Sequence, residues 1–288
     1  MTLAGKVVFH VAAGPRIGFG HLVRCRSLAR ALGVAPVVAI RGTAQTRRRA
    51  AVAGWTVVRS RQLLAMKPDA IVIDDPSPVH SRAIERLARR RGAIAVSIAA
   101  LCMSTTHAVL DPSIVRVRRK AAGSRPRVLI ALGGGAHVFA LAGRISREIA
   151  GRVPGADLVA AAGFSKRARK PALTCGRWIT APDGLAKELS RATVAVVAGG
   201  VTAYEACAIG VPSVAIAVVP AQRPAIRRLA RRRALVDAKH IDAVAGRVAR
   251  LLSNPQARGL LSSAARKTVD GRGARRVADH IRRLVDAA

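Results

Sequence analysis

The sequence predicts an α/β protein of two domains, each built on a mainly parallel sheet covered by helices. Apolar runs of strand length alternate along the chain with Arg-rich stretches of helical period, which is typical of repeated βαβ units. Half of the residues are hydrophobic but only 2% are aromatic, so Ala, Val, Leu and Ile must build the cores. That composition suits strands buried on both faces. The length of 288 residues, against roughly 100 to 200 for one domain, indicates two domains.

The expected elements follow from these patterns in chain order. In the first half the expected strands are Lys6–Val11, Val37–Ile40, Trp55–Val58, Ala70–Ile73, Ala93–Ile98 and, more weakly, Ala108–Leu110. In the second half they are Val128–Ala131, Asp157–Ala162, Arg177–Thr180, Val194–Val197 and Ser213–Ala217. The expected helices are His21–Leu32, Ser81–Arg91, Ala140–Gly151, Gly184–Ser190, Thr202–Ile209, Ala225–Arg233, Ile241–Leu252 and Pro255–Val269.

The segment Ile114–Arg127 breaks this alternation, and the next strand opens a new series of strands and helices. We therefore place the domain boundary there, which gives domains 1–120 and 121–288. The last segment, Asp270–Ala288, carries one more helix that could cross back over the first domain. Two such domains facing each other would leave a cleft at the carboxyl ends of their strands, where open α/β sheets bind ligands.

The formal net charge of +35 comes from 50 Lys and Arg against 15 Asp and Glu, a balance that raises nucleic acid as a partner. The arginines are spread over nearly every expected helix, and one Tyr, two Trp and four Phe do not suffice for a base-stacking platform. We predict no specific nucleic-acid partner. The charge is interpreted as a solvated Arg-rich surface, with peripheral attraction to an anionic membrane as the alternative.

The four cysteines are widely scattered, and no spacing of Cys or His indicates a metal site. No stretch reaches the ~18 uninterrupted apolar residues of a membrane helix. The N-terminal apolar run Val7–Ala13 lacks a signal-peptide cleavage pattern and is interpreted as the first strand. These observations predict a reduced, cytoplasmic protein.

The first candidate site is the glycine-rich loop AAGPRIGFGH, which leads from the first strand into a helix. Gly14, Gly18 and Gly20 let the backbone approach a ligand closely, and the helix N-terminus favours an anionic group. The glycine spacing fits neither a Walker A sequence nor a GxGxxG fingerprint. His21, at the helix entrance, is a candidate for positioning or deprotonating water. The alternative is a histidine that only caps the helix or hydrogen-bonds a loop carbonyl.

The second candidate site follows a buried strand in the stretch VVAGGVTAYEACAIG. Gly199 and Gly200 precede a helix that starts near Thr202, so free N–H groups could hold a diphosphate. Glu205, one turn later, could accept hydrogen bonds from ribose hydroxyls. The alternative is a helix that packs through small residues, with Glu205 simply favourable at a positive helix end.

Two further features stand at expected strand ends. The turn Gly133–Gly134 follows the first strand of the second domain and could bind a phosphate or sugar oxygen on its N–H groups. Asp74 and Asp75 close the strand IVIDD, where a carboxylate could bind sugar hydroxyls or assist water. Adjacent side chains on a strand point apart, which disfavours a shared metal ion.

Taken together, four segments resemble one enzyme family. They are Ile17–Leu32, Leu132–Gly135, Ala198–Ile216 and Val269–Ala278. Their order and motifs, above all GxGHxxRCxxLA, T-x-x-E and DGxGAxRV, resemble the UDP-sugar hydrolase family of pseudaminic acid biosynthesis and its spore-coat polysaccharide relatives. More distantly, the stretch 198–222 looks like the nucleotide-binding part of the glycosyltransferase that makes lipid II.

This resemblance implies a GT-B fold, in which two Rossmann-like domains with parallel sheets face a central cleft. It implies hydrolysis of a UDP-linked amino-deoxy sugar to UDP and free sugar, without a metal or other cofactor. Domain 1–120 would then carry the catalytic histidine and domain 121–288 the nucleotide. The residues expected at the site are His21 and Asp74 as catalytic groups and Gly18, Gly20, Arg24, Gly133, Gly134, Gly199, Gly200, Thr202, Glu205 and Gln222 as substrate-binding groups.

The chain departs from the family pattern at several polar positions. An Arg-x-Asp that commonly ends the first strand is replaced here by His10, Val11 and Ala12, and an Asn that precedes the glutamine is replaced by Ala221. Alternatives to the hydrolase are therefore a GT-B glycosyltransferase that uses a UDP-sugar donor and a degenerate UDP-sugar binder without activity. Nucleic-acid binding is a fourth and weaker alternative. We expect a monomer.

Overall fold

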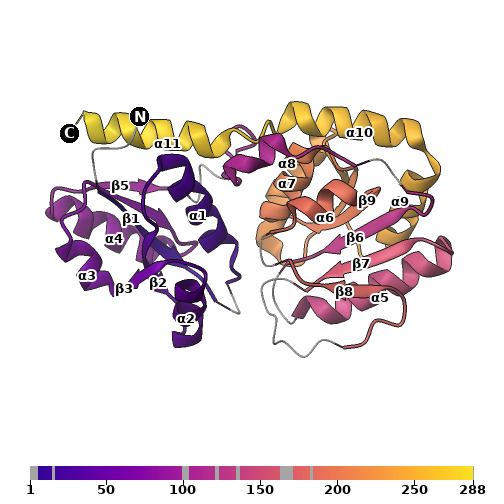
Figure 1. Cartoon of the computed structure of the whole chain (residues 1–288), viewed down its shortest axis with the longest axis horizontal. Helices are drawn as coiled ribbons and strands as arrows, with labels where there is room; N and C mark the ends of the chain where they lie inside the picture. The colour runs from indigo at the N-terminus through magenta and orange to yellow at the C-terminus, as the bar shows by residue number, and fades with distance from the viewer. Residues whose placement is uncertain are drawn as a thin grey trace. The chain divides into compact units, whose positions relative to one another are not determined.

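The computed structural model describes residues 6–14, 17–98, 104–120, 123–133, 137–162, 171–181 and 184–287. The chain divides into two compact units, each with its own sheet (Figure 1). Unit 1 comprises Met1–Pro112 together with Gly271–Ala288, and unit 2 comprises Ser113–Asp270. Each unit is an α/β layer structure, as the sequence predicts.

Unit 1 contains a five-stranded parallel sheet of order β3-β2-β1-β4-β5. Its strands are β1 (Val7–Ala12), β2 (Val37–Arg41), β3 (Thr56–Val58), β4 (Ala70–Asp74) and β5 (Ile94–Ser97). Its helices are α1 (Gly20–Leu32), α2 (Ala44–Val52), α3 (Ser60–Ala65), α4 (Pro78–Arg90) and α11 (Gly273–Asp286).

Alternate residues of β1 enter two different cores, as the two-residue period of a strand requires. Phe9 packs with α1, α11 and Trp55, whose ring lies 5.8 Å from that of Phe9 in an edge-to-face arrangement. Val8 faces the other side and joins Ile71 and Leu63. All six residues of β1 are buried. The continuous apolar run of β1 is therefore explained by a strand that is covered on both faces of the sheet.

The C-terminal helix α11 belongs to unit 1, because its apolar stripe packs on α1. Val277, Ala278 and Ile281 are buried in the same core as Phe9. Arg282 donates from Nη2 to the carbonyl oxygen of Ala31, at 2.9 Å, near the C-terminal end of α1. This hydrogen bond satisfies a carbonyl that lacks a partner within the helix.

The division therefore differs from the one the sequence predicts, 1–120 and 121–288. Residues 113–120 lie in unit 2, where the amide of Lys120 donates to the carbonyl of Ser190 at 2.8 Å. The final helix lies in unit 1, since the apolar face of α11 is completed only by the α1 side of that sheet. The sequence allowed for this return of the last segment, and the structure confirms it, although the division at residues 120 and 121 did not include it.

Unit 2 contains a six-stranded parallel sheet of order β11-β10-β9-β6-β7-β8. Its strands are β6 (Arg127–Ala131), β7 (Asp157–Ala161), β8 (Arg177–Ile179), β9 (Val194–Ala198), β10 (Ser213–Ile216) and β11 (Val236–Asp237). Its helices are α5 (His137–Arg152), α6 (Ala186–Arg191), α7 (Val201–Ile209), α8 (Arg223–Arg231), α9 (Asp242–Ser253) and α10 (Pro255–Thr268), with 3-10 turns η2 (Pro112–Arg116) and η3 (Pro220–Gln222).

The main core of unit 2 lies between the sheet and the helices α5 and α9. Val194 and Val196 of β9 face this side with Ile145 and Val248. Small apolar side chains fill the remaining space, in agreement with the low aromatic content of the chain.

Most expected elements are confirmed, with ends that shift by a few residues. Ala108–Leu110 is not a strand, although all three residues are buried. The helices α2 and α3 and the strand β11 were not predicted. Helix α2 contains three consecutive arginines and buries only two residues, so it carries almost no apolar period. Among the described residues, no helix combines the length and the apolar character that crossing a membrane requires.

Candidate active site

The glycine-rich loop after β1 is closed by a pair of backbone hydrogen bonds. The amide of Gly14 donates to the carbonyl of Gly18 at 3.1 Å, and the amide of Gly18 donates back to Gly14 at 2.7 Å. Gly18 has a φ of +89°, in the left-handed region that favours glycine. Helix α1 then begins at Gly20. This local geometry fixes the position of the first turn of α1, which contains His21.

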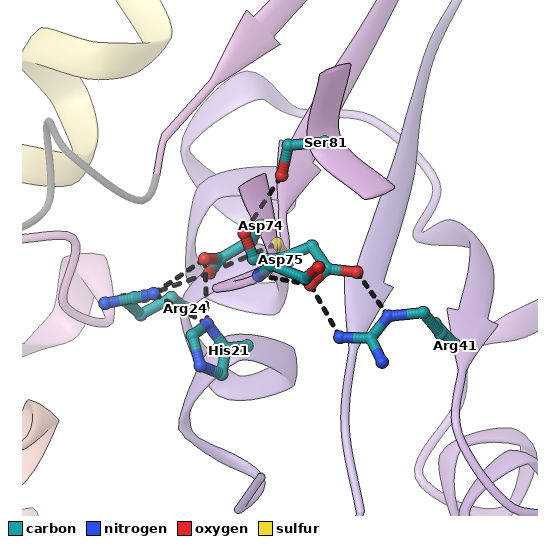
Figure 2. A network of polar contacts seen from close by, with 8 residues as sticks. His21, Arg24, Arg41, Asp74, Asp75 and Ser81 are labelled. Atoms are coloured by element: carbon teal, nitrogen blue, oxygen red, sulfur yellow. Dashed lines mark hydrogen bonds and ion pairs between the residues drawn. The ribbon is translucent and has the colours of Figure 1, made fainter. Parts of the chain in front are cut away.

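His21 and Arg24 lie three residues apart on α1, so they share one face of the helix. Both point toward Asp74, the last residue of β4 (Figure 2). His21 Nδ1 lies 2.8 Å from Asp74 Oδ1, and Arg24 donates from Nη2 to the same oxygen at 2.6 Å. Arg24 also donates from Nε to Asp74 Oδ2 at 3.0 Å. The first turns of α1 and the end of β4 are therefore joined at the carboxylate of Asp74.

Asp74 is fully buried, whereas the side chains of His21 and Arg24 remain 19% and 14% exposed. Burial alone would raise the pKa of Asp74, but the hydrogen bond from His21 and the charge of Arg24 outweigh it, so the pKa lies below its usual value. The carboxylate is thus ionised at neutral pH. The imidazole, unlike the carboxylate, is reachable from solvent.

The ionised carboxylate determines which ring nitrogen of His21 carries hydrogen. His21 Nδ1 lies 2.8 Å from Asp74 Oδ1 and also 2.9 Å from Arg24 Nη2, which only donates. Arg24 Nη2 already donates to Asp74 Oδ1 at 2.6 Å, and a carboxylate only accepts, so a hydrogen on Nδ1 avoids placing two lone pairs against each other and is the favoured arrangement. In the neutral ring Nδ1–H then donates to Asp74, and Nε2 keeps the lone pair. A His–Asp pair with this tautomer can take a proton from a hydroxyl group or a water molecule. Both predicted catalytic residues therefore lie in one hydrogen-bonded pair.

Asp75, the next residue, has a different set of partners. Arg41, the last residue of β2, donates from Nε and Nη2 to the two oxygens of Asp75 at 2.6 and 2.7 Å, and it reaches Asp75 from the side away from His21 (Figure 2). The amide of Ser77 donates to Asp75 Oδ1 at 2.8 Å, and Ser81 donates from its hydroxyl to the Asp75 carbonyl. The two adjacent acids thus bind different partners: Asp74 binds His21 and Arg24, and Asp75 binds Arg41.

Arg41 was not singled out in the sequence, and neither was the buried His10 beside it. His10 is only 4% exposed. Burial lowers its pKa, the charge of Asp75 raises it, and Arg41 and His80 lower it further, with a net shift downward. The signal available in the sequence was the position of Arg41 at the carboxyl end of an expected strand.

In unit 2, the glycine pair after β9 leads into α7 as predicted. Gly200 is the residue before α7, and no side chain caps that helix end. The first turn of α7 also carries no acidic residue, and although the amide of Ala203 donates to the carbonyl of Gly200 at 3.1 Å, the dipole at this helix end favours an anion. A Cβ placed on Gly200 would meet no atom within 4 Å. Thr202 and Glu205, three residues apart on α7, are both half-buried.

Gly199 has a packing role. A Cβ on Gly199 would lie 2.7 Å from the carbonyl oxygen of Gln222 and 2.8 Å from Ile226, so only glycine fits under η3 and α8. Gln222 accepts at its side-chain oxygen from the amide of Val218, at 2.8 Å. This contact holds the loop after β10 and uses the side-chain oxygen of Gln222, a residue that we expected to bind the substrate.

Gly133, which follows β6, lies at the same register position as Gly199, which follows the neighbouring strand β9. In the register of β6 and β9, Ala131 pairs with Val197, and each glycine follows two residues later. Gly133 is exposed, with a φ of +117°. The two glycine turns therefore share the carboxyl edge of one sheet. Gly134 lies outside the described residues.

The predicted residues thus form two groups within the two units. Gly18, Gly20, His21, Arg24 and Asp74 gather in unit 1. Gly133, Gly199, Gly200, Thr202, Glu205 and Gln222 gather in unit 2. Among the described residues, no group of three or more His, Cys, Asp or Glu is arranged to hold a metal ion.

The chain is similar to known proteins in a part of its sequence and in its whole fold. The family model "Glycosyl transferases group 1" matches residues 180–268, which include the β9–α7 turn. No curated protein sequence matches the chain.

Three solved structures illustrate the likeness in fold. MurG from Acinetobacter baumannii is 16% identical with a TM-score of 0.66, over 96% of this chain and 99% of that one. A protein from Listeria monocytogenes described as a UDP-N-acetylglucosamine 2-epimerase is 12% identical with a TM-score of 0.61, over 99% and 98%. Glycosyltransferase SsfS6 from Streptomyces sp. SF2575, in complex with thymidine diphosphate, is 15% identical with a TM-score of 0.61, over 99% and 100%. The chain has the GT-B fold, two Rossmann-like units with parallel sheets.

Proposed function

We propose that this chain is a GT-B glycosyltransferase that uses a UDP-sugar donor, with His21 as the general base. The observation that carries the proposal is the His21–Asp74 pair, in which a buried ionised carboxylate holds Nδ1–H and leaves Nε2 as acceptor. The match of residues 180–268 to group 1 glycosyl transferases supports donor binding on unit 2. The thymidine diphosphate in the similar SsfS6 structure supports a nucleoside diphosphate as the bound product.

The proposed reaction is a displacement at the anomeric carbon of the donor. Nε2 of His21 takes the proton of an acceptor hydroxyl group, whose oxygen forms a bond to the anomeric carbon. The bond from that carbon to the diphosphate breaks, and UDP leaves with the electron pair. General-base help of this type contributes about 10²- to 10⁴-fold in rate. Asp74 keeps the ring in the required tautomer and stabilises the imidazolium that forms.

The N–H groups of Val201 and Thr202 at the start of α7, together with the helix dipole, would stabilise the charge on the leaving diphosphate. Glu205 would accept hydrogen bonds from the ribose hydroxyls, and Gly200 would let the diphosphate approach the backbone. Gln222 would then act by holding the loop 218–222 against Gly199.

A second candidate is hydrolysis, with water in place of the acceptor hydroxyl. It is favoured by the segment Ile17–Leu32, whose GxGHxxRC pattern resembles the UDP-sugar hydrolase family. The same His21–Asp74 pair serves both reactions. UDP release that requires an added acceptor selects the transferase, and release in buffer alone selects the hydrolase.

The proposal is tested by incubating the protein with UDP-amino-sugars, with and without sugar acceptors, and by measuring UDP release. We expect His21→Ala and Asp74→Asn to lower the rate by about 10²- to 10⁴-fold and to leave UDP affinity within a few-fold of wild type.

Asp75→Asn is the matched control, because Asp75 is equally buried but contacts Arg41 instead of His21. This variant should keep most of the rate. Equal losses in Asp74→Asn and Asp75→Asn would remove the His21–Asp74 pair from the mechanism. UDP binding without turnover of any donor would instead indicate a binding protein.

A further inference from the structure

A cavity of about 640 Å³ opens on unit 2 between α8, β11, α9 and α10. Figure 1 shows α9 and α10 following each other along this side of the unit. The lining residues fall between 230 and 267 and include neither the β9–α7 turn nor Gln222. The cavity is therefore separate from the proposed nucleotide site.

The floor of this cavity is apolar. Leu235 and Leu251 are 2% and 5% exposed, and Leu261 is half-buried beside them. Leu260, also in the lining, is 75% exposed. The exposed side chain of Leu260 thus extends the apolar surface of the cavity to its edge. An apolar surface of this kind is typical of a site that binds an apolar chain.

The rim of the cavity is basic. The lining contains no acidic residue, and its four cations are Arg233, Arg247, Arg250 and Lys267. All four are exposed, and none forms an ion pair with the described part of the chain. Arg233 has a φ of +55°, in the region that glycine normally occupies after a helix end.

We propose that this cavity binds an anionic phospholipid of a membrane surface. The phosphate would lie among the four cations, and an acyl chain would lie along the leucine floor. The lining has no aromatic side chain for a base to stack on, and Asn254 uses its side-chain oxygen to cap α10. Inorganic phosphate would leave the leucines without a partner. An anionic lipid has both a phosphate for the basic residues of the rim and an acyl chain for the leucines of the floor.

The experiment must separate this cavity from the diffuse charge of a chain with 50 Lys and Arg. Each cation close to an anionic membrane contributes about fivefold in affinity. We compare R247Q/R250Q with R86Q/R89Q, which removes two exposed cations at the same spacing from α4 of unit 1. Equal thermal midpoints establish that both variants are folded.

Binding is measured by sedimentation with phosphatidylcholine vesicles that contain or lack about one-third phosphatidylglycerol. We expect R247Q/R250Q to lose at least about tenfold in affinity, and R86Q/R89Q to lose less than about threefold. Wild-type binding should persist at about 0.5 M sodium chloride, where the Debye length is only about 4 Å and long-range attraction is screened. Equal losses in the two variants would show that diffuse charge alone binds the membrane.

Insertion of the apolar chain is tested with L260W, which places an indole at the lip of the cavity. We expect phosphatidylglycerol brominated on its acyl chains to quench the indole fluorescence. Inorganic phosphate at equal ionic strength should not reverse this quenching. Binding without quenching, or reversal by phosphate, would overturn the proposal and indicate a simple anion site or an acidic protein partner.

Discussion

Asp74 and Asp75 are neighbours in the chain, yet each carboxylate is held by an arginine from a different element. Arg24 comes from α1 and Arg41 from the end of β2. Both acids have a pKa below the usual value, because hydrogen bonds and nearby cations outweigh the effect of burial. One acid orients a histidine that is reachable from solvent, and the other fixes the end of a strand.

Sequence reasoning found both members of the His21–Asp74 pair but not their contact. The two residues are 53 positions apart, and the contact depends on the register that places Val11 beside Asp74. A single sequence does not contain that register. The position of Arg41 at the end of an expected strand was a weak signal, because arginine is so frequent here that one more at a strand end is not distinctive.

His10 gives unit 1 a predictable dependence of stability on pH. Its folded-state pKa is lowered below 6.5, chiefly by burial, against the opposing charge of Asp75 and with the help of Arg41 and His80. Between the folded value and 6.5 the unfolded chain binds a proton that the folded chain does not, so stability falls as pH falls through this window. The slope approaches about 1.4 kcal/mol per pH unit for one proton.

The test is urea denaturation of wild type and His10→Gln at several pH values between neutral and about 5. The variant should show a shallower fall in the free energy of unfolding. His280→Gln, which changes an exposed histidine on α11 of the same unit, should retain the wild-type slope. A wild-type slope in His10→Gln would contradict this assignment.

At the scale of elements, α11 shows how a sequence motif can be structural. The motif DGRGARRV spans the return of the chain to unit 1, and Gly273 begins the helix against the segment 107–108. A Cβ on Gly273 would lie 2.2 Å from the carbonyl oxygen of Ala108 and 2.7 Å from its nitrogen. Backbone atoms cannot rotate away, so this contact requires glycine.

Gly273→Ala should therefore destabilise unit 1 by about 1–3 kcal/mol, as overpacking does, although alanine normally favours a helix. Gly246→Ala is the matched control, because a Cβ at that position in α9 would meet no atom within 4 Å. The control should gain about 0.5–1 kcal/mol. Urea denaturation measures both values, and a stabilised Gly273→Ala would contradict the close approach.

Helices with a clear apolar stripe were predicted, and those without one were missed. Helix α1 buries residues at helical spacing, among them Leu22, Cys25 and Leu32. Helix α2 buries only Thr46 and Ala50, and its capping residue Thr43 is a common loop residue as well. The strand β11 has two residues, too few for a period to be seen.

At the scale of the whole molecule, the net charge of +35 is spread along the chain and is not concentrated in one segment. Fifteen acids can pair with at most a fraction of the 50 cations, so repulsion among the remaining cations opposes folding. The two-unit fold itself was predictable, because alternating strands and helices repeat along the chain. The membership of α11 was not, since it depends on which core its stripe completes.

Screening this repulsion should stabilise the protein. We expect the midpoint of thermal unfolding to rise by roughly 2–4 °C between low salt and about 0.3 M sodium chloride, as a gain of about 1 kcal/mol would give at this size. An uncharged osmolyte at equal osmolality controls for exclusion effects. A midpoint that falls with salt would mean that ion pairs such as Arg41–Asp75 outweigh the repulsion.

The return of α11 also sets an order for biosynthesis. Unit 2 is continuous in the chain, so its core can form as soon as residue 270 has left the ribosome. The core of unit 1 needs both residues 7–109 and residues 274–281, so the half that is made first is completed last. The core around the His21–Asp74 pair is thus complete only after residues 274–281 have been made. A shortened chain that ends before α11 would release a folded unit 2 beside an incomplete unit 1.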